Sequence, residues 1–235
     1  MLPVAILAGG LATRLQHLSK DTPKSMIKIC NKPFAQWQVE SLVKQGVHDA
    51  VFCVGYKAEA IEDFMGDGAQ FGLNIRYSYD GETLLGTGGA IVKALPLLGD
   101  KFMVLNGDSY LPTDFSPIEI AFLKSGKPAL MTIYLNENTS ETNNVVFQNG
   151  ELLLYEKNHF LTEMKYIDYG LSFFTSNVFN SFKTLKPLDL SEICFELSKM
   201  RLLAPYEVKR RFYEIGSFHG IEEFTRYIEE HKYEL

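Results

Sequence analysis

Two glycines, an arginine and a lysine near the N-terminus have the types and spacing to hold a polyphosphate. The apolar run Val4–Leu7 is followed by Gly9 and Gly10, and Arg14 and Lys24 lie in the polar stretch beyond them. Glycine lets the backbone approach a ligand closely, and successive amide N–H groups in such a loop form an anion-binding concavity. Together with the two positive charges, this loop is predicted to bind a polyphosphate. The alternative is that the glycines only form a turn and that Arg14 and Lys24 are solvated.

The segment Gly86-Thr87-Gly88-Gly89 is a second candidate binding element, because it precedes a predicted helix over 90–98. Backbone amides of glycines at a helix N-terminus can bind an anion, and a bare glycine backbone can lie flat against a planar ring. A simple loop-to-helix turn explains the same residues equally well, so the spacing leaves both interpretations open.

One carboxylate and one ion pair follow predicted strands. Asp108 comes directly after the buried run Phe102–Leu105, beside Gly107. Mg²⁺ takes one or two carboxylates and completes its shell with water and phosphate oxygens, so Asp108 is a candidate ligand, and the alternative is an Asp that caps a turn. The pair Glu156-Lys157, taken by itself, is typical of a solvated surface.

Short apolar runs alternate with helical patterns over the first half of the chain, which predicts βαβ units and a mostly parallel sheet with helices on both faces. Strands are expected over 4–7, 49–54, 74–79 and 102–105, helices over 33–45, 58–65 and 90–98, and a long polar loop over 8–32. Ligands of such open sheets bind at the carboxyl ends of the strands, which is where the candidate residues fall.

The pattern becomes mixed after Pro112. Helices are predicted over 117–125, 176–185 and 190–200, strands over 129–135, 166–174 and 212–215, and a hairpin over 145–155 with Asn149-Gly150 in a type I′ turn. Ser217 is predicted to be the N-cap residue of a final helix. We therefore expect an α/β fold, a Rossmann-like doubly wound mixed sheet with a smaller second lobe. The chain would be a single domain over 1–235, with lobes of about 1–112 and 113–235.

Composition and charge exclude several classes of protein. Hydrophobic residues make up 46% of the 235 residues, which favours a folded core over disorder. The formal net charge of −6 argues against a broad nucleic-acid-binding face. No apolar run has the length of a membrane span, and the N-terminus lacks the pattern of a signal peptide. The three cysteines are widely spaced, so we expect reduced thiols in a cytoplasmic protein rather than disulfides or a zinc site.

The stretch Leu7-Ala8-Gly9-Gly10-Leu11-Ala12-Thr13-Arg14-Leu15, followed by Pro23-Lys24, resembles a known signature. It is similar to the L-A-G-G-x-G-T-R-L and P-K of the sugar-1-phosphate nucleotidylyltransferases. Ala12 stands where that family usually has glycine. The segment Leu85–Ile91 is similar to the family's base-contacting segment. Asn106-Gly107-Asp108 is similar to its G-D motif, whose Asp binds Mg²⁺.

Three further segments carry the resemblance with departures. Glu156-Lys157 matches an E-K pair that binds the sugar phosphate, although Asn158 replaces the usual proline. Asp168-Tyr169-Gly170 stands in place of N-A-G, which leaves the sugar open. Phe212–Ser217 is similar to an aromatic-x-D-x-G-[TS] element whose Asp is the second metal ligand, and Glu214 holds that position here.

The resemblance implies that the chain joins a nucleoside triphosphate (NTP) and a sugar 1-phosphate into a nucleoside diphosphate (NDP)-sugar and releases pyrophosphate. Arg14 would hold the leaving pyrophosphate, Lys24 would meet the α-phosphate, and Asp108 would be the third catalytic residue. The residues implied in nucleotide binding are Leu7, Gly9, Gly10, Thr13, Gly86, Thr87 and Gly88. Those implied in sugar-phosphate binding are Asn144, Glu156, Lys157 and Gly170. The implied cofactor is Mg²⁺, on Asp108 and Glu214.

Within the family, the length and the segments Val54–Lys57, Leu85–Ile91 and Gly216-Ser217 look most like the heptose 1-phosphate guanylyltransferases. That likeness implies GTP and D-glycero-α-D-manno-heptose 1-phosphate as substrates, and GDP-heptose for bacterial surface polysaccharide or capsule synthesis.

Several alternatives stay open. Within the family they are uridylyl- or cytidylyltransferases that act on N-acetylmuramate 1-phosphate, hexose 1-phosphates or phosphocholine. From other classes they are a glycosyltransferase, which the lack of an Asp-x-Asp motif disfavours, and a non-catalytic nucleotide sensor. The residues leave the oligomeric state open, a homo-oligomer included.

Overall fold

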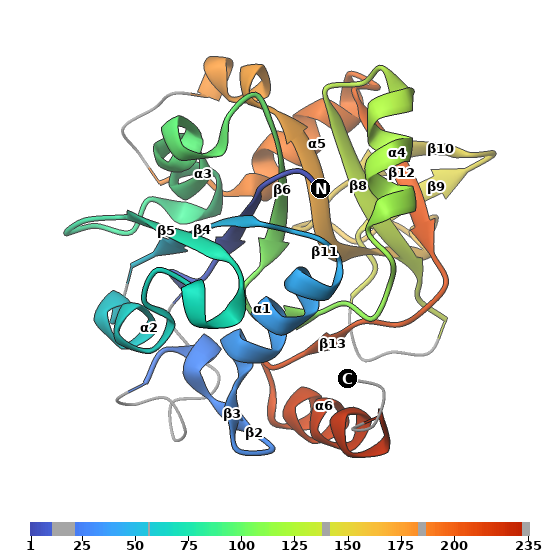
Figure 1. Cartoon of the computed structure of the whole chain (residues 1–235). Helices are drawn as coiled ribbons and strands as arrows, with labels where there is room; N and C mark the ends of the chain where they lie inside the picture. Colours follow the sequence, from blue (N-terminus) through green and yellow to red (C-terminus); the bar gives the residue numbers. More distant parts are fainter. Residues whose placement is uncertain (11–21, 56, 138–141, 183–186, 232–235) are drawn as a thin grey trace.

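A β-sheet runs through the middle of the computed structural model, which describes residues 1–10, 22–55, 57–137, 142–182 and 187–231 (Figure 1). Its centre is four parallel strands in the order β6 (Lys101–Asn106), β1 (Val4–Leu7), β4 (Asp49–Val54) and β5 (Asn74–Tyr79). This parallel centre confirms the predicted βαβ units.

The second half of the chain continues the same sheet with mixed directions. Strand β11 (Tyr166–Thr175) is antiparallel to β6, and it also pairs with β8 (Ala129–Leu135). The hairpin of β9 (Val145–Gln148) and β10 (Glu151–Tyr155) joins the start of β11. Asn149 and Gly150 both have positive φ, at 53° and 82°, which confirms the predicted type I′ turn.

The structure adds to the main sheet one strand that the sequence did not predict. Strand β12 (Leu203–Val208) is parallel to β8 and pairs with no other strand in the part of the chain that the structure describes. Pro205 interrupts its apolar pattern and has no N–H for a sheet ladder, which argues against a central strand. An edge position tolerates this proline because one side of the strand needs no partner.

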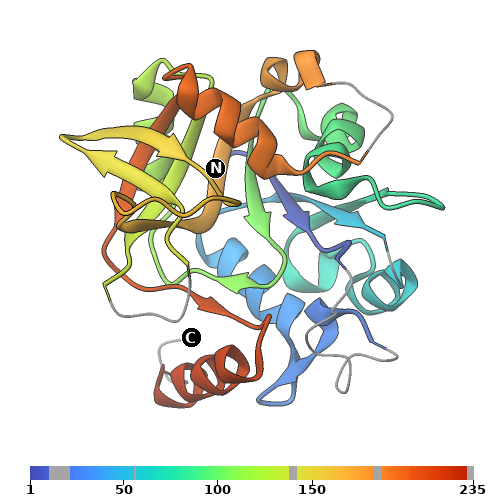
Figure 2. The same ribbon diagram turned by 180° about the vertical axis from the view of Figure 1, so that it is seen from behind.

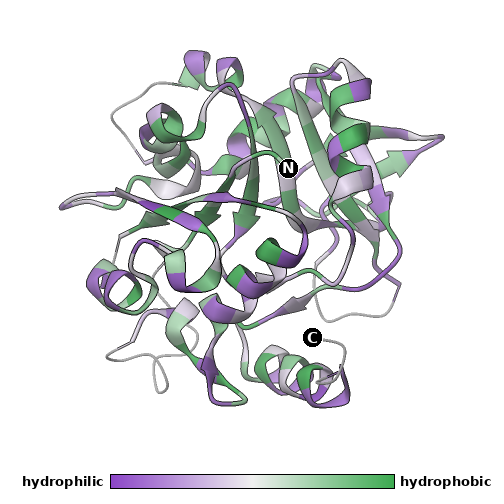
Figure 3. Cartoon of the chain, in the orientation of Figure 1, coloured by the Kyte–Doolittle hydropathy of each residue, from purple (hydrophilic) through white to green (hydrophobic). Residues whose placement is uncertain are grey.

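Helices cover both faces of the sheet, as expected of a doubly wound fold (Figures 1 and 2). The side chains of Val4 and Ile6 pack in one core with α1 (Phe34–Lys44), α2 (Ala58–Met65) and α4 (Ser116–Ser125). Ala5 points the other way and packs with α3 (Gly86–Leu98), α5 (Leu190–Lys199) and the 3₁₀ helix η4 (Ser176–Phe182). This alternation follows from the two-residue period of a strand, and Figure 3 shows the strands as the most hydrophobic layer.

The last helix, α6 (Phe218–His231), forms a separate apolar cluster below the sheet (Figure 1). Fully buried Phe224 packs edge-on against Phe34, with ring centroids 5.3 Å apart, and lies 4.9 Å from Tyr110. The cluster supports a small two-stranded sheet of β7 (Ser109–Tyr110) and β13 (Tyr213–Glu214). Helix α6 thereby fixes the segments that carry Asp108 and Glu214.

Other expectations need correction. The predicted loop over 8–32 contains the 3₁₀ helix η2 (Lys24–Met26) and a short hairpin of β2 (Lys28–Ile29) and β3 (Lys32–Pro33). The helix expected over 176–185 is the 3₁₀ helix η4 over residues 176–182, and residues 183–185 of that prediction lie outside the described residues. Helix α3 begins at Gly86 and continues through Pro96, so the glycine segment is its first turn and not a preceding loop.

No helix among the described residues is long and apolar enough to cross a membrane. The boundary of the two lobes near residue 112 stays a prediction.

Candidate active site

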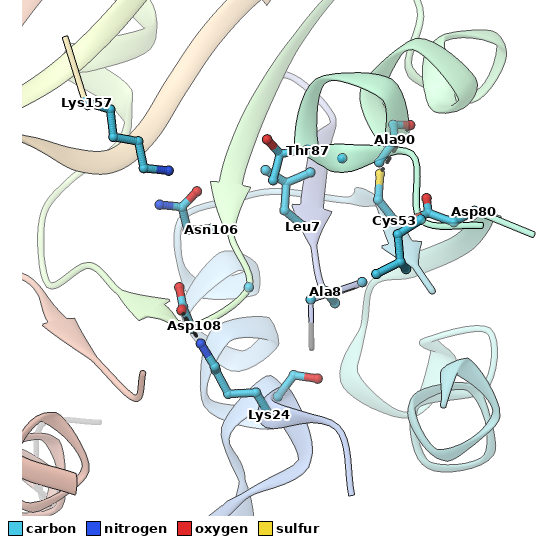
Figure 4. A pocket seen from close by; sticks show the side chains of 16 residues that line it. Leu7, Ala8, Lys24, Cys53, Asp80, Thr87, Ala90, Asn106, Asp108 and Lys157 are labelled. Atoms are coloured by element: carbon cyan, nitrogen blue, oxygen red, sulfur yellow. Dashed lines mark hydrogen bonds and ion pairs between the residues drawn. The ribbon is translucent and has the colours of Figure 1, made fainter. Parts of the chain in front are cut away.

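Most of the candidate residues that the structure describes lie around a cavity of about 330 Å³ at the carboxyl ends of the parallel strands (Figure 4). Residues predicted to bind nucleotide supply much of the wall, and they are Leu7, Gly9, Gly10, Gly86 and Thr87. The charged side chains of Lys24, Asp108 and Lys157 lie toward one end, and Cys53, Asp80 and Ala90 lie toward the other (Figure 4). The volume falls within the range of small-ligand pockets. Thr13 and Arg14 lie outside the described residues.

Lys24 and Asp108 form an ion pair at the charged end. Lys24 Nζ lies 2.9 Å from Asp108 Oδ2, although 84 positions separate the two residues in sequence. Both side chains are partly exposed to the cavity, so a bound ligand can reach them. The predicted catalytic lysine and carboxylate are therefore in direct contact.

Glu214 lies beside this ion pair because β13 pairs with β7, immediately after Asp108. The backbone N–H of Ile215 donates to the Asp108 carbonyl at 3.0 Å. The Glu214 carboxylate accepts hydrogen bonds from the Gly216 N–H and, at 2.6 Å, from the Ser217 hydroxyl. Ser217 also accepts from the Gly220 N–H at 2.9 Å, which confirms it as the cap of α6.

Gly216 lies between the two carboxylates, where a side chain would not fit. A Cβ built there would lie 2.5 Å from Glu214 Oε2, 3.5 Å from Lys24 Nζ and 3.6 Å from Asp108 Oδ2. Asp108 and Glu214 both line the second cavity, and carboxylates are the hard oxygen donors that Mg²⁺ takes, with water and phosphate oxygens for the remaining positions. Among the described residues, no group of three or more His, Cys, Asp and Glu side chains gathers as a metal site. The pair fits a Mg²⁺ ion that depends on its substrate for ligands.

Gln38 of α1 holds the turn that carries Asp108. Its buried side-chain amide donates to the carbonyls of Asn106 and Ser109, at 2.9 and 2.8 Å. These two carbonyls lie on either side of Asp108 in sequence, so one side chain fixes both ends of the turn. Gly107 allows the turn to lie against β1, because a Cβ there would be only 2.4 Å from the Leu7 carbonyl oxygen.

The opposite end of the cavity is apolar and contains Asp80. Cys53 and Ala90 lie at this end, and Leu84 lies near Asp80, while Leu7 and Ala8 line the middle of the cavity (Figure 4). Burial, with a smaller contribution from the charge of Asp80, raises the pKa of Cys53 to about 12. Its thiol is thus protonated near neutral pH and is a poor nucleophile. Burial also raises the pKa of Asp80, against hydrogen bonding from the Leu85 N–H and the charge of Lys93.

The first turn of α3 packs against a neighbouring segment instead of opening fully to the cavity. The N–H groups of Gly88 and Gly89 donate to the Leu188 carbonyl, at 2.8 and 3.1 Å, and a Cβ on Gly86 would lie 2.5 Å from that oxygen. The Thr87 hydroxyl accepts from the Leu190 N–H at 2.8 Å. Gly88 was predicted to bind nucleotide, but its N–H is already bonded and it does not line the cavity. Close packing with Leu188 explains the need for glycine here.

A second cavity of about 450 Å³ adjoins the first and contains most of the predicted sugar-phosphate residues. Asn144, Lys157 and Gly170 line it, together with Asp168 and Glu214. The Asn144 Oδ1 accepts from the Asp168 N–H, and the Asp168 carboxylate accepts from the Gly170 N–H, both at 2.9 Å. Asn106, Asp108 and Lys157 line both cavities, so the two cavities meet at these residues.

Of the residues predicted to bind the sugar phosphate, Glu156 is the one that does not line the second cavity. Its carboxylate accepts from the Asn158 N–H at 2.6 Å and lies 3.7 Å from His159 Nδ1. It lines neither of the two cavities. Asn158 makes this local bond possible because, unlike the proline that the resemblance led us to expect, it has an N–H to donate.

Lys157 shares a small cavity with Asp168 and Asp189, two carboxylates with opposite pKa shifts. Burial raises the pKa of Asp168, and the Gly170 N–H and the charge of Lys157 only partly oppose that shift. For Asp189 burial acts in the same direction, but hydrogen bonds from Ser191 and the charge of Lys157 outweigh it and lower the pKa. A small cavity of about 90 Å³ includes all three side chains in its wall.

Sequence reasoning missed Gln38, Asp80, Asp168 and Asp189 as contributors to the site. Asp80 carried the same signal as Asp108, since it directly follows a strand, and could have been found that way. Asp168 was noted only as a departure from the family pattern. Gln38 lies in the middle of a helix, and its role depends on a tertiary contact with no local signature.

Cavities at the carboxyl ends of a parallel sheet suit a nucleotide-binding enzyme, and the comparison with known proteins identifies its class. The Nucleotidyl transferase family matches residues 4–230. The chain belongs to this family, which confirms the resemblance that the motifs carried.

Two relatives and one solved structure show which members of the family the chain is similar to. D-glycero-alpha-D-manno-heptose 1-phosphate guanylyltransferase of Campylobacter jejuni is 33% identical over 191 residues, which are 81% of this chain and 84% of that protein. N-acetylmuramate alpha-1-phosphate uridylyltransferase of Neisseria meningitidis is 38% identical over 112 residues, which are 47% of this chain and 48% of that protein. The crystal structure of HddC from Yersinia pseudotuberculosis complexed with GMP-PN has a TM-score of 0.79 and 25% identity, over 97% of this chain and all of that one.

Replacing Gln38 should weaken the fold at the Asp108 turn. Gln38→Met keeps the shape of the side chain but leaves the Asn106 and Ser109 carbonyls unpaired, so the free energy of unfolding should fall by about 1–3 kcal/mol. Urea denaturation measures this, and hydrogen exchange should accelerate at residues 107–110. Gln36→Met on the same helix is the control, because Gln36 bonds Glu40, one turn along the helix, and not the Asp108 turn. Equal stability of the two variants would contradict the assignment.

Neutralising Asp168 and neutralising Asp189 should change Tm in opposite directions. The raised pKa of Asp168 means that its ionised form costs stability above the pKa of the unfolded chain, so Asp168→Asn should raise Tm near pH 7. The lowered pKa of Asp189 means that ionisation stabilises the fold, so Asp189→Asn should lower Tm near pH 7. Both differences should shrink near pH 3, where both carboxyls approach protonation in the unfolded chain. Shifts of the same sign near pH 7 would show that the electrostatic account is wrong.

Proposed function

We propose that this nucleotidyltransferase transfers GMP from GTP to D-glycero-α-D-manno-heptose 1-phosphate, giving GDP-heptose and pyrophosphate. The observation that carries the proposal is the meeting of two ligand-sized cavities at Asn106, Asp108 and Lys157. The first cavity has an apolar end suited to a base and a charged end suited to phosphates. The second, lined by Asn144, Asp168 and Gly170, offers polar groups suited to a sugar.

In the proposed reaction a phosphate oxygen of the sugar 1-phosphate attacks the α-phosphorus of GTP. The bond from that phosphorus to the oxygen bridging to the β-phosphate breaks, and pyrophosphate leaves with the electron pair. The attacking oxygen is already anionic, so the step needs no general base. Two anions must be held in line, so positioning and charge neutralisation supply most of the catalysis.

The described residues would divide this work by location. Lys24 would neutralise the α-phosphate, because it reaches the charged end of the first cavity beside Asp108. Lys157 would hold the sugar phosphate, because it lines both cavities. Asp108 and Glu214 would hold Mg²⁺, which when bound neutralises charge on phosphate oxygens. Arg14 keeps its proposed role at the leaving pyrophosphate, outside the described residues.

The choice of GTP and heptose is supported by relatives. The Campylobacter jejuni relative is named for heptose 1-phosphate and guanylyl transfer, and the similar HddC structure is a complex with GMP-PN. The test measures pyrophosphate release from ATP, CTP, GTP and UTP with heptose, mannose, glucose and N-acetylmuramate 1-phosphates and with phosphocholine. Best turnover with UTP and an amino sugar, or with CTP and phosphocholine, would contradict the substrates but keep the reaction. No pyrophosphate release from any pair would contradict the reaction.

Neutralising Asp108 should nearly abolish turnover without unfolding the protein. Asp108→Asn removes both the partner of Lys24 and a carboxylate ligand, so kcat should fall by about 10²–10³-fold, the scale of one lost electrostatic stabiliser. Steady-state kinetics at saturating Mg²⁺ measures this. The control is Asp114→Asn, since Asp114 is exposed and only caps its own turn. Near-normal kcat for Asp108→Asn would remove Asp108 from the catalytic residues.

Removing Lys157 should separate the two substrates. If Lys157 binds the sugar phosphate, Lys157→Ala should raise the KM of the acceptor about tenfold or more and change the KM of GTP far less. Lys165→Ala is the matched control, because Lys165 is an exposed lysine outside both cavities. An equal rise in both KM values, or a rise for GTP alone, would place Lys157 on the nucleotide instead.

A further inference from the structure

The apolar end of the first cavity contains one carboxylate, and its surroundings suit a particular base. We propose that Asp80 selects guanine, by accepting hydrogen bonds from the N1–H and the exocyclic 2-amino group of the base. The inference rests on the proposed function, because it names the residue that chooses the donor nucleotide. Asp80 was not among the residues that the motifs identified.

Asp80 is held where three strand ends meet. It directly follows β5, whose neighbours in the sheet are β4 and then β1. A Cβ built on Gly55, just after β4, would lie 3.3 Å from Asp80 Oδ2, and one on Gly9, beyond β1, would lie 3.6 Å from it. The two glycines therefore leave the carboxylate uncovered on the side of the strand ends.

The walls around Asp80 suit the faces of a planar ring. Ala90 and Leu84 supply apolar surface near Asp80, and Leu7 and Ala8 continue it along the middle of the cavity (Figure 4). Among the described residues of the cavity wall, the other carboxylate is Asp108, which lies toward the opposite end with Lys24 (Figure 4). A nucleotide with its phosphates at Lys24 would thus place its base near Asp80.

A carboxylate discriminates among bases because it accepts hydrogen bonds and cannot donate them when ionised. Guanine presents two adjacent donors, N1–H and the 2-amino group, which a carboxylate can accept together. Uracil places its one N–H between two carbonyls, and adenine and cytosine place an amino group beside a ring nitrogen that needs a donor. Each of these bases would leave an acceptor facing the carboxylate, and such buried mismatches are strongly rejected.

The present partners of Asp80 leave capacity for the base. The Leu85 N–H donates to Oδ2 at the long distance of 3.3 Å, and Lys93 Nζ donates to the backbone carbonyl instead of the carboxylate. Burial already disfavours the charge on this group, as its raised pKa indicates. Two donors from guanine would compensate for that cost in the complex.

The competing explanation is structural, since Leu85 is the N-cap residue of α3 and Asp80 bonds its N–H. The test therefore uses inosine triphosphate (ITP), which differs from GTP only in lacking the 2-amino group. Isothermal titration calorimetry with Mg²⁺, and without any sugar phosphate, measures Kd for GTP and ITP. The proteins are the native chain, Asp80→Asn, Asp80→Ala and the control Glu82→Gln, an exposed carboxylate two residues away that does not line the cavity.

We expect the native chain and Glu82→Gln to bind GTP about 10- to 100-fold more tightly than ITP, the scale of one hydrogen bond to a charged group. In Asp80→Ala this ratio should fall close to one, and Asp80→Asn should lie between, because its amide oxygen still accepts. A ratio unchanged in both Asp80 variants, with only a lower Tm, would overturn the inference in favour of helix capping. Tighter binding of ATP, CTP or UTP than of GTP by the native chain would also overturn it.

The same design separates this inference from the proposed function. Binding is measured without an acceptor, so the GTP-to-ITP ratio reports on Asp80 even if no sugar phosphate is turned over. Absence of pyrophosphate release with every acceptor would overturn the proposed reaction, while loss of the ratio in Asp80→Ala would still support guanine selection.

Discussion

The main constraint on this site is the repulsion between the two anions that must meet there. Two unit charges of like sign about 4 Å apart repel by about 4 kcal/mol near a protein surface, and each phosphate group carries more than one charge. Lys24 lies at the charged end of the first cavity, and Lys157 lines both cavities. The Lys24–Asp108 ion pair at 2.9 Å keeps the lysine in place before any ligand arrives. The rest of the structure serves to hold these charges in position.

The fold meets this constraint by holding the two carboxylates, Asp108 and Glu214, through contacts with segments that are distant in sequence. Asp108 follows β6, and Gln38 of α1 bonds the carbonyls on both sides of it. Glu214 is placed by the pairing of β13 with β7, which the apolar cluster around Phe224 supports. Elements distant in sequence therefore converge and place the two carboxylates side by side. Such preorganisation is what electrostatic catalysis requires.

Much of this arrangement could be predicted from sequence, and the failures have physical causes. The strand ends and their glycines predicted where Leu7, Lys24 and Asp108 would lie, because the parallel centre of the sheet brings those ends to one edge. The contacts of Gln38, and of Leu188 with the first turn of α3, join segments far apart in sequence and leave no local pattern. Pro205 concealed β12, since a proline argues against a strand unless the strand is at an edge. Glu156 differs from expectation because Asn158 offers a nearby N–H.

Direct transfer between two adjacent cavities is the central claim, and the stereochemistry at the α-phosphorus tests it most directly. GTP made chiral there by sulfur substitution would be converted with the sugar 1-phosphate, and ³¹P NMR would assign the configuration of the product. The account predicts inversion, because one in-line attack by the sugar phosphate displaces pyrophosphate. Retention would indicate two successive displacements through a covalent nucleotidyl-enzyme and would contradict the account.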